Sequence, residues 1–238
     1  LVASGCYVTV GVTAEDAALK DLCDTMNRCR DMVITYQFGE QTIKLEGETI
    51  CTWILGSTQD GLVDVNYDKA AAFVKSMADQ YDTAGKTRAF HTTTGKDLNL
   101  TGPYGWQIDQ AGETASLIAM IRTGQSQLRE PLYSKKAQDR TTDWGKTYVE
   151  IDLTNQHVYM YQDGNLAWDA PCVTGNVSKN YTTPEGIYSL TYKQTDRVLR
   201  GEKKADGTYE YESHVDYWMP FNGGIGLHDA SWRSKFGG

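Results

Sequence analysis

The sequence predicts an α+β protein, with a mixed α/β domain over residues 1–135, a linker over 136–145 and a sheet-rich, mainly β domain over 146–238. Apolar side chains recur at helical spacing only in the first half of the chain. Between Tyr133 and Gly145 the chain is polar and has no period, which is typical of a domain boundary. After this stretch apolar and polar residues alternate, as they do in strands. We expect the second domain to lack its C-terminal part, amounting to a strand or two.

The N-terminal domain opens with an alternating segment at 1–12, which predicts a strand. An approximate capping box at Thr13–Asp16 then predicts a helix over 14–31. A polar strand at 42–45 and a short apolar stretch at 52–55 follow. This half of the chain is therefore expected to mix both kinds of element.

Two further helices are predicted before the linker. A core-facing stripe marks a helix over 66–82, and its members are Tyr67, Ala70, Val74, Met77 and Tyr81. Residues 83–109 are rich in Thr and Gly with aromatic residues between them, so strands and turns are expected there. The pattern over 113–123 is helical again, and Gly124 is suited to end that helix.

Short strands follow one another in the C-terminal domain. Alternation over 148–153 and 157–161 predicts two of them, and Asp163-Gly164 is a strong hairpin signal. Asp206-Gly207 marks another turn. Further strands are expected at 166–173, 186–193 and 209–217.

The composition argues against several classes of function. The formal net charge is −8, and no stripe of Lys and Arg is interleaved with aromatic residues, so no nucleic-acid partner is expected. No apolar run approaches the length of about 18 residues that a membrane span needs, and the N-terminal residues lack the pattern of a signal peptide. The chain opens on Leu1 rather than Met, so an N-terminal anchor missing from this sequence is the one membrane attachment left open.

Five cysteines cannot all pair within one chain. Cys23 and Cys29 point to different sides of one predicted helix, which suits neither a bridge nor a pair of zinc ligands. Buried free thiols are therefore expected, with a bridge involving Cys6 or a metal site as the alternatives, and we expect no metal and no cofactor. Cys172 has no base or cation near it in the sequence to activate it, so it is predicted to be a structural strand residue.

The most suggestive chemistry stands near the C-terminal end of the sequence. His228 lies among glycines that let backbones approach closely, and Asp229 and Trp232 follow it. A histidine in this setting is a candidate general base, but the chain offers it no partner nucleophile, so spacing alone leaves the role open. The other histidines are isolated in the sequence and are predicted to be surface or hydrogen-bonded residues: His91, His157 and His214.

Several pieces of the sequence carry a resemblance to a known family. In the second domain they are Val149–Leu153, Gln156–Tyr159, Val173–Asn176, Thr183–Tyr188 and Gly226–Ala230. On these pieces residues 146–238 resemble the catalytic domain of the L,D-transpeptidases, the YkuD family. The region from about residue 20 to 135 looks like the peptidoglycan-binding-type domain that often precedes it in Gram-positive bacteria. Its matching pieces are Trp53, Asp60-Gly61, Tyr81–Thr83, Arg88–Phe90, Gly102–Asp109 and Pro131–Tyr133.

The resemblance implies a peptidoglycan L,D-transpeptidase that forms 3-3 cross-links between stem peptides through a cysteine thioester. His228 matches the first histidine of the family signature and would act as the general base. The residues that would bind the stem peptide are Trp218, Phe221, Gly226, Asp229 and Trp232. The alternative for the three aromatic residues is that they pack the edge of the sheet.

The family signature continues with Ser/Thr-His-Gly-Cys, which this sequence does not contain. The nucleophilic cysteine is therefore expected beyond Gly238, the chain alone is expected to be inactive, and Cys172 is not a substitute. The alternatives are a non-catalytic peptidoglycan-binding module and an L,D-carboxypeptidase, in which water replaces the acceptor amine. We also expect a monomeric, secreted protein of the cell wall or the outer face of the cytoplasmic membrane. The family further implies a part in wall biogenesis and cell shape, and sensitivity to carbapenems.

Overall fold

The computed structural model describes residues 16–237, so the predicted strand at 1–12 and Cys6 lie outside the described residues. The chain divides into two compact units. The first holds the chain up to Asp82 together with Trp106–Lys136, and the second holds Thr83–Gly105 together with the chain from Ala137 onward.

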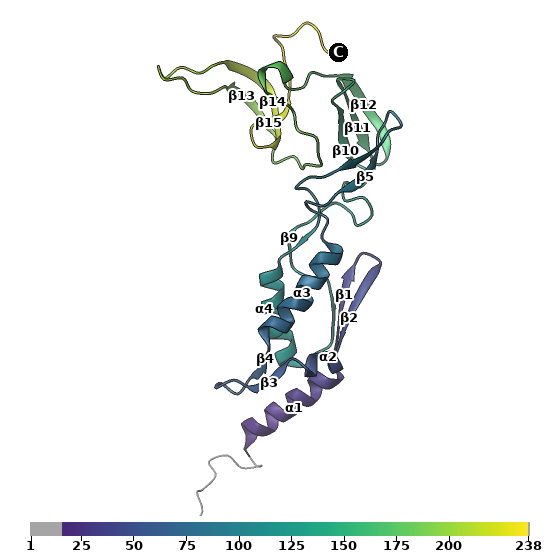
Figure 1. The fold of residues 1–238 in the computed structure, drawn as a ribbon, viewed down its shortest axis with the longest axis vertical. Coiled ribbons are helices and arrows are strands. Elements are labelled where there is room, and N and C mark those ends of the chain that lie inside the picture. The colour runs from purple at the N-terminus through teal and green to yellow at the C-terminus, as the bar shows by residue number, and fades with distance from the viewer. Residues whose placement is uncertain (1–15, 238) are drawn as a thin grey trace, which may run out of the picture. The chain divides into compact units, whose positions relative to one another are not determined.

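The first unit combines helices with small sheets (Figure 1). Its helices are α1 (Ala17–Asp31), α2 (Gly47–Cys51), α3 (Tyr67–Tyr81) and α4 (Gln110–Thr123). Its strands are β1 (Val33–Phe38), β2 (Gln41–Glu46), β3 (Ile54–Ser57), β4 (Val63–Val65), β7 (Gln107–Ile108), β8 (Gln127–Arg129) and β9 (Tyr133–Lys135). A three-stranded sheet has the order β2-β1-β8, with β8 parallel to β1. The helices α3 and α4 pack against each other.

Local capping signals explain where the helices begin and end. Asp16 opens α1, because its side chain accepts the N–H groups of Ala18 and Leu19, at 2.9 and 3.2 Å. Asn66 opens α3 in the same way, and Gly124 ends α4 in the left-handed conformation with φ of 64°. The three predicted helices are thus confirmed, although α1 begins at Ala17 rather than at residue 14.

The core of the first unit lies between these helices and the sheet. The predicted stripe of α3 supplies Ala70, Val74 and Met77, each 0% exposed, to one cluster with residues of β1 and α4. Tyr67, the first member of the predicted stripe, is instead exposed. Strand β1 was absent from the sequence expectations, yet its alternate residues Ile34 and Tyr36 are fully buried. The predicted strand at 42–45 is confirmed as β2.

A buried carboxylate joins three elements of the first unit. Glu113 on α4 is 0% exposed and accepts hydrogen bonds from the hydroxyl of Tyr36 at 2.7 Å and the guanidinium of Arg129 at 3.0 Å. The backbone N–H of Leu132 donates a third bond to it at 2.7 Å. Burial, followed by the nearby Glu113 charge, raises the pKa of Tyr36, so the phenol stays protonated and keeps donating. The carboxylate therefore ties the sheet to α4 from inside the core.

The second unit is built from three small antiparallel sheets. A hairpin pairs β5 (Arg88–His91) with β6 (Asp97–Leu100). The next sheet has the order β10-β11-β12, made of Tyr148–Asp152, His157–Gln162 and Asn165–Pro171. The last has the order β13-β14-β15, made of Gln194–Arg200, Glu212–Asn222 and Ile225–His228. A 3-10 turn spans Val177–Lys179.

Turn residues in the sequence correctly predicted one hairpin of this unit. Asp163 and Gly164 have φ of 51° and 83°, as the tight turn of a hairpin requires, and they join β11 to β12 as predicted. The predicted strand at 186–193 is wrong. There the N–H and C=O of Ile187 bond to Thr101 and Tyr104, each at 3.3 Å, whereas the N–H of Thr191 bonds to the carbonyl of Pro220 on β14 at 2.8 Å, so this backbone makes separate bonds and no strand ladder.

Residues 83–105 join the second unit, whereas the sequence pattern grouped them with the first domain. Arg88 forms a buried ion pair with Asp143, which lies in the predicted linker, and donates to the carbonyl of Tyr104 at 2.6 Å. The buried carboxylate of Glu150 accepts from the N–H of Thr93 at 3.0 Å and from its hydroxyl at 2.6 Å. These polar contacts join the β5–β6 hairpin to Asp143 on one side and to Glu150 of β10 on the other.

Glu113→Ala is expected to destabilise the first unit by about 3 kcal/mol, because it removes one partner of a buried ion pair and takes away the acceptor of Nη2 of Arg129 and of the phenol of Tyr36. Chemical denaturation followed by circular dichroism measures the loss. The control is Lys75→Ala, which breaks the exposed pair with Asp79 and is expected to cost less than about 0.5 kcal/mol. Equal losses in both variants would contradict the structural role of Glu113.

Candidate active site

The candidate site is built on strand β14, which pairs antiparallel with β13 through its first half and with β15 through its second. At the end of β15, His228 stands directly opposite Trp218. This pairing brings the strands very close at Gly226, where a Cβ atom would lie 2.7 Å from both the carbonyl oxygen of Met219 and the Cα of Pro220. Gly226 is therefore needed for the approach of the two backbones.

The imidazole of His228 is held in one tautomer. Its Nδ1 lies 2.7 Å from the backbone carbonyl oxygen of Asp229. A carbonyl oxygen can only accept, so Nδ1 carries the proton and the neutral ring has its lone pair on Nε2. Among the described residues no side chain or backbone group forms a hydrogen bond with Nε2, and the residue is exposed. This ring is therefore ready to accept a proton at Nε2.

Two indoles flank the imidazole. The ring centroid of Trp218 lies 6.0 Å from that of His228, and the centroid of Trp232 lies 5.9 Å away in a stacked orientation. Trp218 is 5% exposed and supports the ring from the protein side, whereas Trp232 is 53% exposed. A turn closed by the N–H of Arg233 and the carbonyl of Ala230, 2.9 Å apart, follows His228 and leads to Trp232.

The side chain of Asp229 does not contact the imidazole of His228 by a hydrogen bond. Its Oδ1 accepts the backbone N–H of Tyr217 at 2.8 Å, so the carboxylate is attached to β14. Burial raises the pKa of this carboxyl, but the backbone hydrogen bonds from Tyr217 and Asp216 outweigh burial and the pKa is lowered. Asp229 is therefore ionised at neutral pH.

An apolar cleft of about 670 Å³ lies in the same unit, on a different side of β15. Aromatic and aliphatic residues dominate its walls, among them Phe90, Trp144, Met160, Tyr188, Phe221 and Leu227. Successive side chains of a strand point to opposite faces, so Leu227 faces the cleft and His228 faces away from it. The structure thus brings Trp218, Asp229 and Trp232 to the imidazole, while Phe221 lines the cleft.

The remaining cysteines and histidines have different surroundings from His228. Burial, followed by the charge of Asp152, raises the pKa of the Cys172 thiol, which disfavours a thiolate. Cys29 is a buried free thiol as expected, but Cys23 is exposed. Each of the other histidines is hydrogen-bonded to an aspartate across a hairpin, as predicted for surface residues, and the pairs are His91–Asp97, His157–Asp169 and His214–Asp196.

Comparison with known proteins identifies the family of this chain. Residues 146–238 match the model of the L,D-transpeptidase catalytic domain, YkuD, and residues 20–129 match a peptidoglycan binding domain. The solved Ldtfm–avibactam carbamoyl enzyme is 31% identical, and the alignment covers 92% of this chain and 85% of that chain with a TM-score of 0.71. The chain belongs to the L,D-transpeptidase family.

A second solved structure agrees with this assignment. It is the crystal structure of a cysteine-to-serine mutant of the Enterococcus faecium L,D-transpeptidase, 30% identical, with 92% of this chain and 86% of that chain covered and a TM-score of 0.70. No match was found among curated protein sequences. The α+β architecture and the peptidoglycan transpeptidase function expected from the sequence are thus confirmed. Its peptidoglycan domains make this transpeptidase a cell-wall-associated protein.

Within residues 16–237, no group of three or more His, Cys, Asp or Glu side chains is arranged to hold a metal ion. In the same range, no helix combines the length and the apolar character that crossing a membrane requires.

Sequence reasoning missed the groups that orient His228. They are the backbone carbonyl of Asp229 and the N–H of Tyr217, and main-chain groups carry no signal in residue identity. For His214 the sequence predicted a surface or hydrogen-bonded residue but not its partner, which is Asp196 at 2.6 Å, across the β13–β14 pair. Asp196 has φ of 55°, an unusual conformation inside a strand that Asp tolerates better than most residues.

His214→Asn is expected to lower the thermal midpoint of the second unit more at about pH 5 than at about pH 9. The hydrogen bond to Asp196 is the main cause that raises the pKa of His214, so the folded state binds the proton more tightly than the unfolded state. The stabilisation is complete below the unfolded pKa and is lost as pH rises through the raised folded pKa. Differential scanning calorimetry at both pH values measures it. A double-mutant cycle with Asp196→Asn should show coupling only at the lower pH, and coupling that is equal at both would contradict the ion pair.

Proposed function

We propose that this L,D-transpeptidase forms 3-3 cross-links between peptidoglycan stem peptides through a cysteine thioester, with His228 as the general base. The observation that supports this role is the hydrogen bond from Nδ1 to the carbonyl of Asp229, which leaves Nε2 unprotonated on an exposed face. A histidine whose Nε2 is free to accept a proton suits the role of a general base.

The reaction proceeds in two acyl transfers. The thiol of the nucleophilic cysteine gives its proton to Nε2 of His228 and attacks the carbonyl between the third residue and the terminal D-alanine of a tetrapeptide stem. The carbon–nitrogen bond breaks, D-alanine leaves with the proton that His228 returns, and a thioester remains. The side-chain amine of a neighbouring stem then attacks the thioester and gives a proton to His228. The carbon–sulfur bond breaks, and His228 returns the proton to the sulfur, so the thiol is regenerated.

The nucleophile is proposed to lie outside these 238 residues. No cysteine of the sequence follows Ser/Thr-His-Gly, and the thiol of Cys172 has a raised pKa that suits a structural residue. The oxyanion hole of the family signature is assigned to the same missing segment. The 238-residue chain alone is accordingly proposed to carry the base and part of the substrate surface, and to perform no acyl transfer.

The stem peptide is proposed to lie on the face that carries His228. Trp232 is the exposed wall of this surface, and Trp218 acts from beneath the imidazole. Gly226 and Asp229 contribute by setting the backbone of β15 and its continuation. Phe221 lies in the cleft, where it packs 5.6 Å from Tyr188, which favours sheet packing for that residue. The first unit is proposed to hold the wall polymer while a monomeric, extracellular enzyme acts on its stems.

Trp232→Ala is expected to weaken binding of a synthetic stem tetrapeptide about fivefold to tenfold, because it removes an exposed aromatic wall next to His228. Titration of the 238-residue chain followed by NMR chemical shifts gives the dissociation constant and shows which residues respond. Trp168→Ala is the matched control, since Trp168 is 55% exposed on β12 and is expected to leave the affinity unchanged. Chemical-shift changes confined to the cleft residues would contradict this placement and indicate that the stem peptide binds in the cleft.

A carbapenem is expected to leave the mass of the 238-residue chain unchanged, in the parent and in Cys172→Ser alike, because the proposed nucleophile is absent. The full-length protein should gain one adduct on the cysteine of the Ser/Thr-His-Gly-Cys signature, and His228→Gln should slow that acylation by about 10²-fold to 10⁴-fold. Intact-mass spectrometry with peptide mapping measures both.

An adduct on Cys172 would contradict the assignment, and release of D-alanine without cross-linked product would make the enzyme an L,D-carboxypeptidase. Stem binding by the full-length protein without any adduct would identify a non-catalytic module.

A further inference from the structure

Asp229 is the point at which the base-bearing strand is attached to its neighbour. Its Oδ1 accepts the N–H of Tyr217 at 2.8 Å, beyond the last pair of the β14–β15 ladder, which joins Trp218 to His228. The side chain thus replaces the next rung of the ladder with a carboxylate-to-backbone bond. Bonds of this kind, with a charged acceptor, are stronger than neutral ones.

The backbone of β14 needs such a fastening at this position. Val215 is fully buried, yet further along the strand it is Trp218 that is buried, so the inward face of β14 changes between them. On the facing strand, Asp196 adopts a left-handed conformation between the paired residues Thr195 and Arg197. The face of β14 that points inward therefore changes at residues 216–217. The carboxylate of Asp229 binds at this change.

The same residue directs the imidazole. The carbonyl of Asp229 accepts the Nδ1–H of His228 at 2.7 Å, and the direction of that carbonyl follows from the backbone angles of Asp229. Because the carboxylate fixes those angles by holding Tyr217, the side chain governs where the carbonyl points. Trp218 is the residue next to Tyr217, so the same bond also holds the indole beside the imidazole.

We propose that Asp229 is a positioning residue for the base: its carboxylate, by clamping β14 at Tyr217, selects the His228 tautomer that leaves Nε2 free. This inference rests on the proposed role of His228 as the general base. It differs from the expectation that Asp229 binds the stem peptide, because the carboxylate is already committed to the main chain of its own sheet. It also differs from a catalytic triad, in which an acid would bind the imidazole through its side chain.

The test is long-range ¹H–¹⁵N NMR of the imidazoles in the 238-residue chain, which reports the tautomer of each neutral histidine. The parent should show His228 mainly with its proton on Nδ1. Asp229→Ala should shift the tautomer ratio toward Nε2–H by about fivefold, the effect of losing one ordinary hydrogen bond, and should change the ring-current shifts that Trp218 causes. Asp229→Asn keeps an acceptor oxygen for Tyr217 and should restore the parental ratio.

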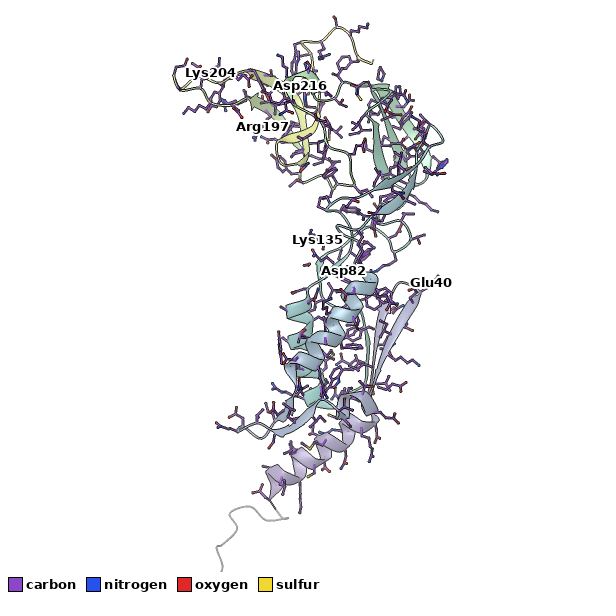
Figure 2. All side chains as sticks on the ribbon, viewed as in Figure 1. Glu40, Asp82, Lys135, Arg197, Lys204 and Asp216 are labelled. Atoms are coloured by element: carbon purple, nitrogen blue, oxygen red, sulfur yellow. The ribbon has the colours of Figure 1, made fainter. Side chains whose placement is uncertain are left out.

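Asp216→Ala is the matched control. It removes a carboxylate from the adjoining position on β14 but keeps the backbone N–H, so the tautomer should be unchanged (Asp216 is labelled in Figure 2). The His157–Asp169 resonances, on a different sheet, report whether each variant is folded.

The possible outcomes separate this inference from the proposed function. A parental tautomer ratio in Asp229→Ala would overturn the clamp, as would an Asp229→Asn variant that behaves like Asp229→Ala, since charge rather than geometry would then be responsible. If the parent chain carries the proton of His228 on Nε2, the proposed role of His228 as a base is contradicted, whatever the variants show.

Discussion

The candidate active site depends on the double pairing of β14. Eleven residues, Glu212–Asn222, serve as the partner of β13 at one end and of β15 at the other. The two halves present different faces to the interior, with Val215 buried in one and Trp218 in the other. The β14–β15 ladder ends at the pair Trp218–His228, so the N–H of Tyr217 beyond it needs another acceptor. Asp229 supplies one, and His228 is the residue before it.

Much of the local structure was predictable because its causes are local. Asn66 and Gly124 act on neighbouring peptide groups, so α3 and the end of α4 could be placed from sequence, as could the Asp163-Gly164 hairpin. Strand β15 was missed because it is short and contains Gly226, and glycine has low strand propensity; it exists through its pairing with β14. The region 186–193 was wrongly predicted as a strand, because its backbone groups bond to separate partners: Thr101, Tyr104 and Pro220.

In the candidate site, too, the features with local causes were predictable and those that depend on distant partners were not. His228 could be singled out from its neighbours in the sequence, and the family resemblance named its role. Its tautomer could not be predicted, because it is set by a carbonyl whose direction depends on a bond between Asp229 and Tyr217. The association of residues 83–105 with the second unit likewise depends on distant polar partners, Arg88 with Asp143 and Thr93 with Glu150. Hydrophobic periodicity does not report such pairs.

The alternation of β15 assigns packing and chemistry to opposite faces of one strand. Leu227 points into the apolar cleft, where a base would be desolvated and its charged form disfavoured. His228, one residue on, is exposed, so its Nε2 is open to a reacting group on that face. The half-buried Cys172 shows the other result, since burial raises the pKa of its thiol and keeps it protonated. The two indoles of Trp218 and Trp232 beside the imidazole, together with the orienting bond at Nδ1, distinguish His228 from the other exposed histidines.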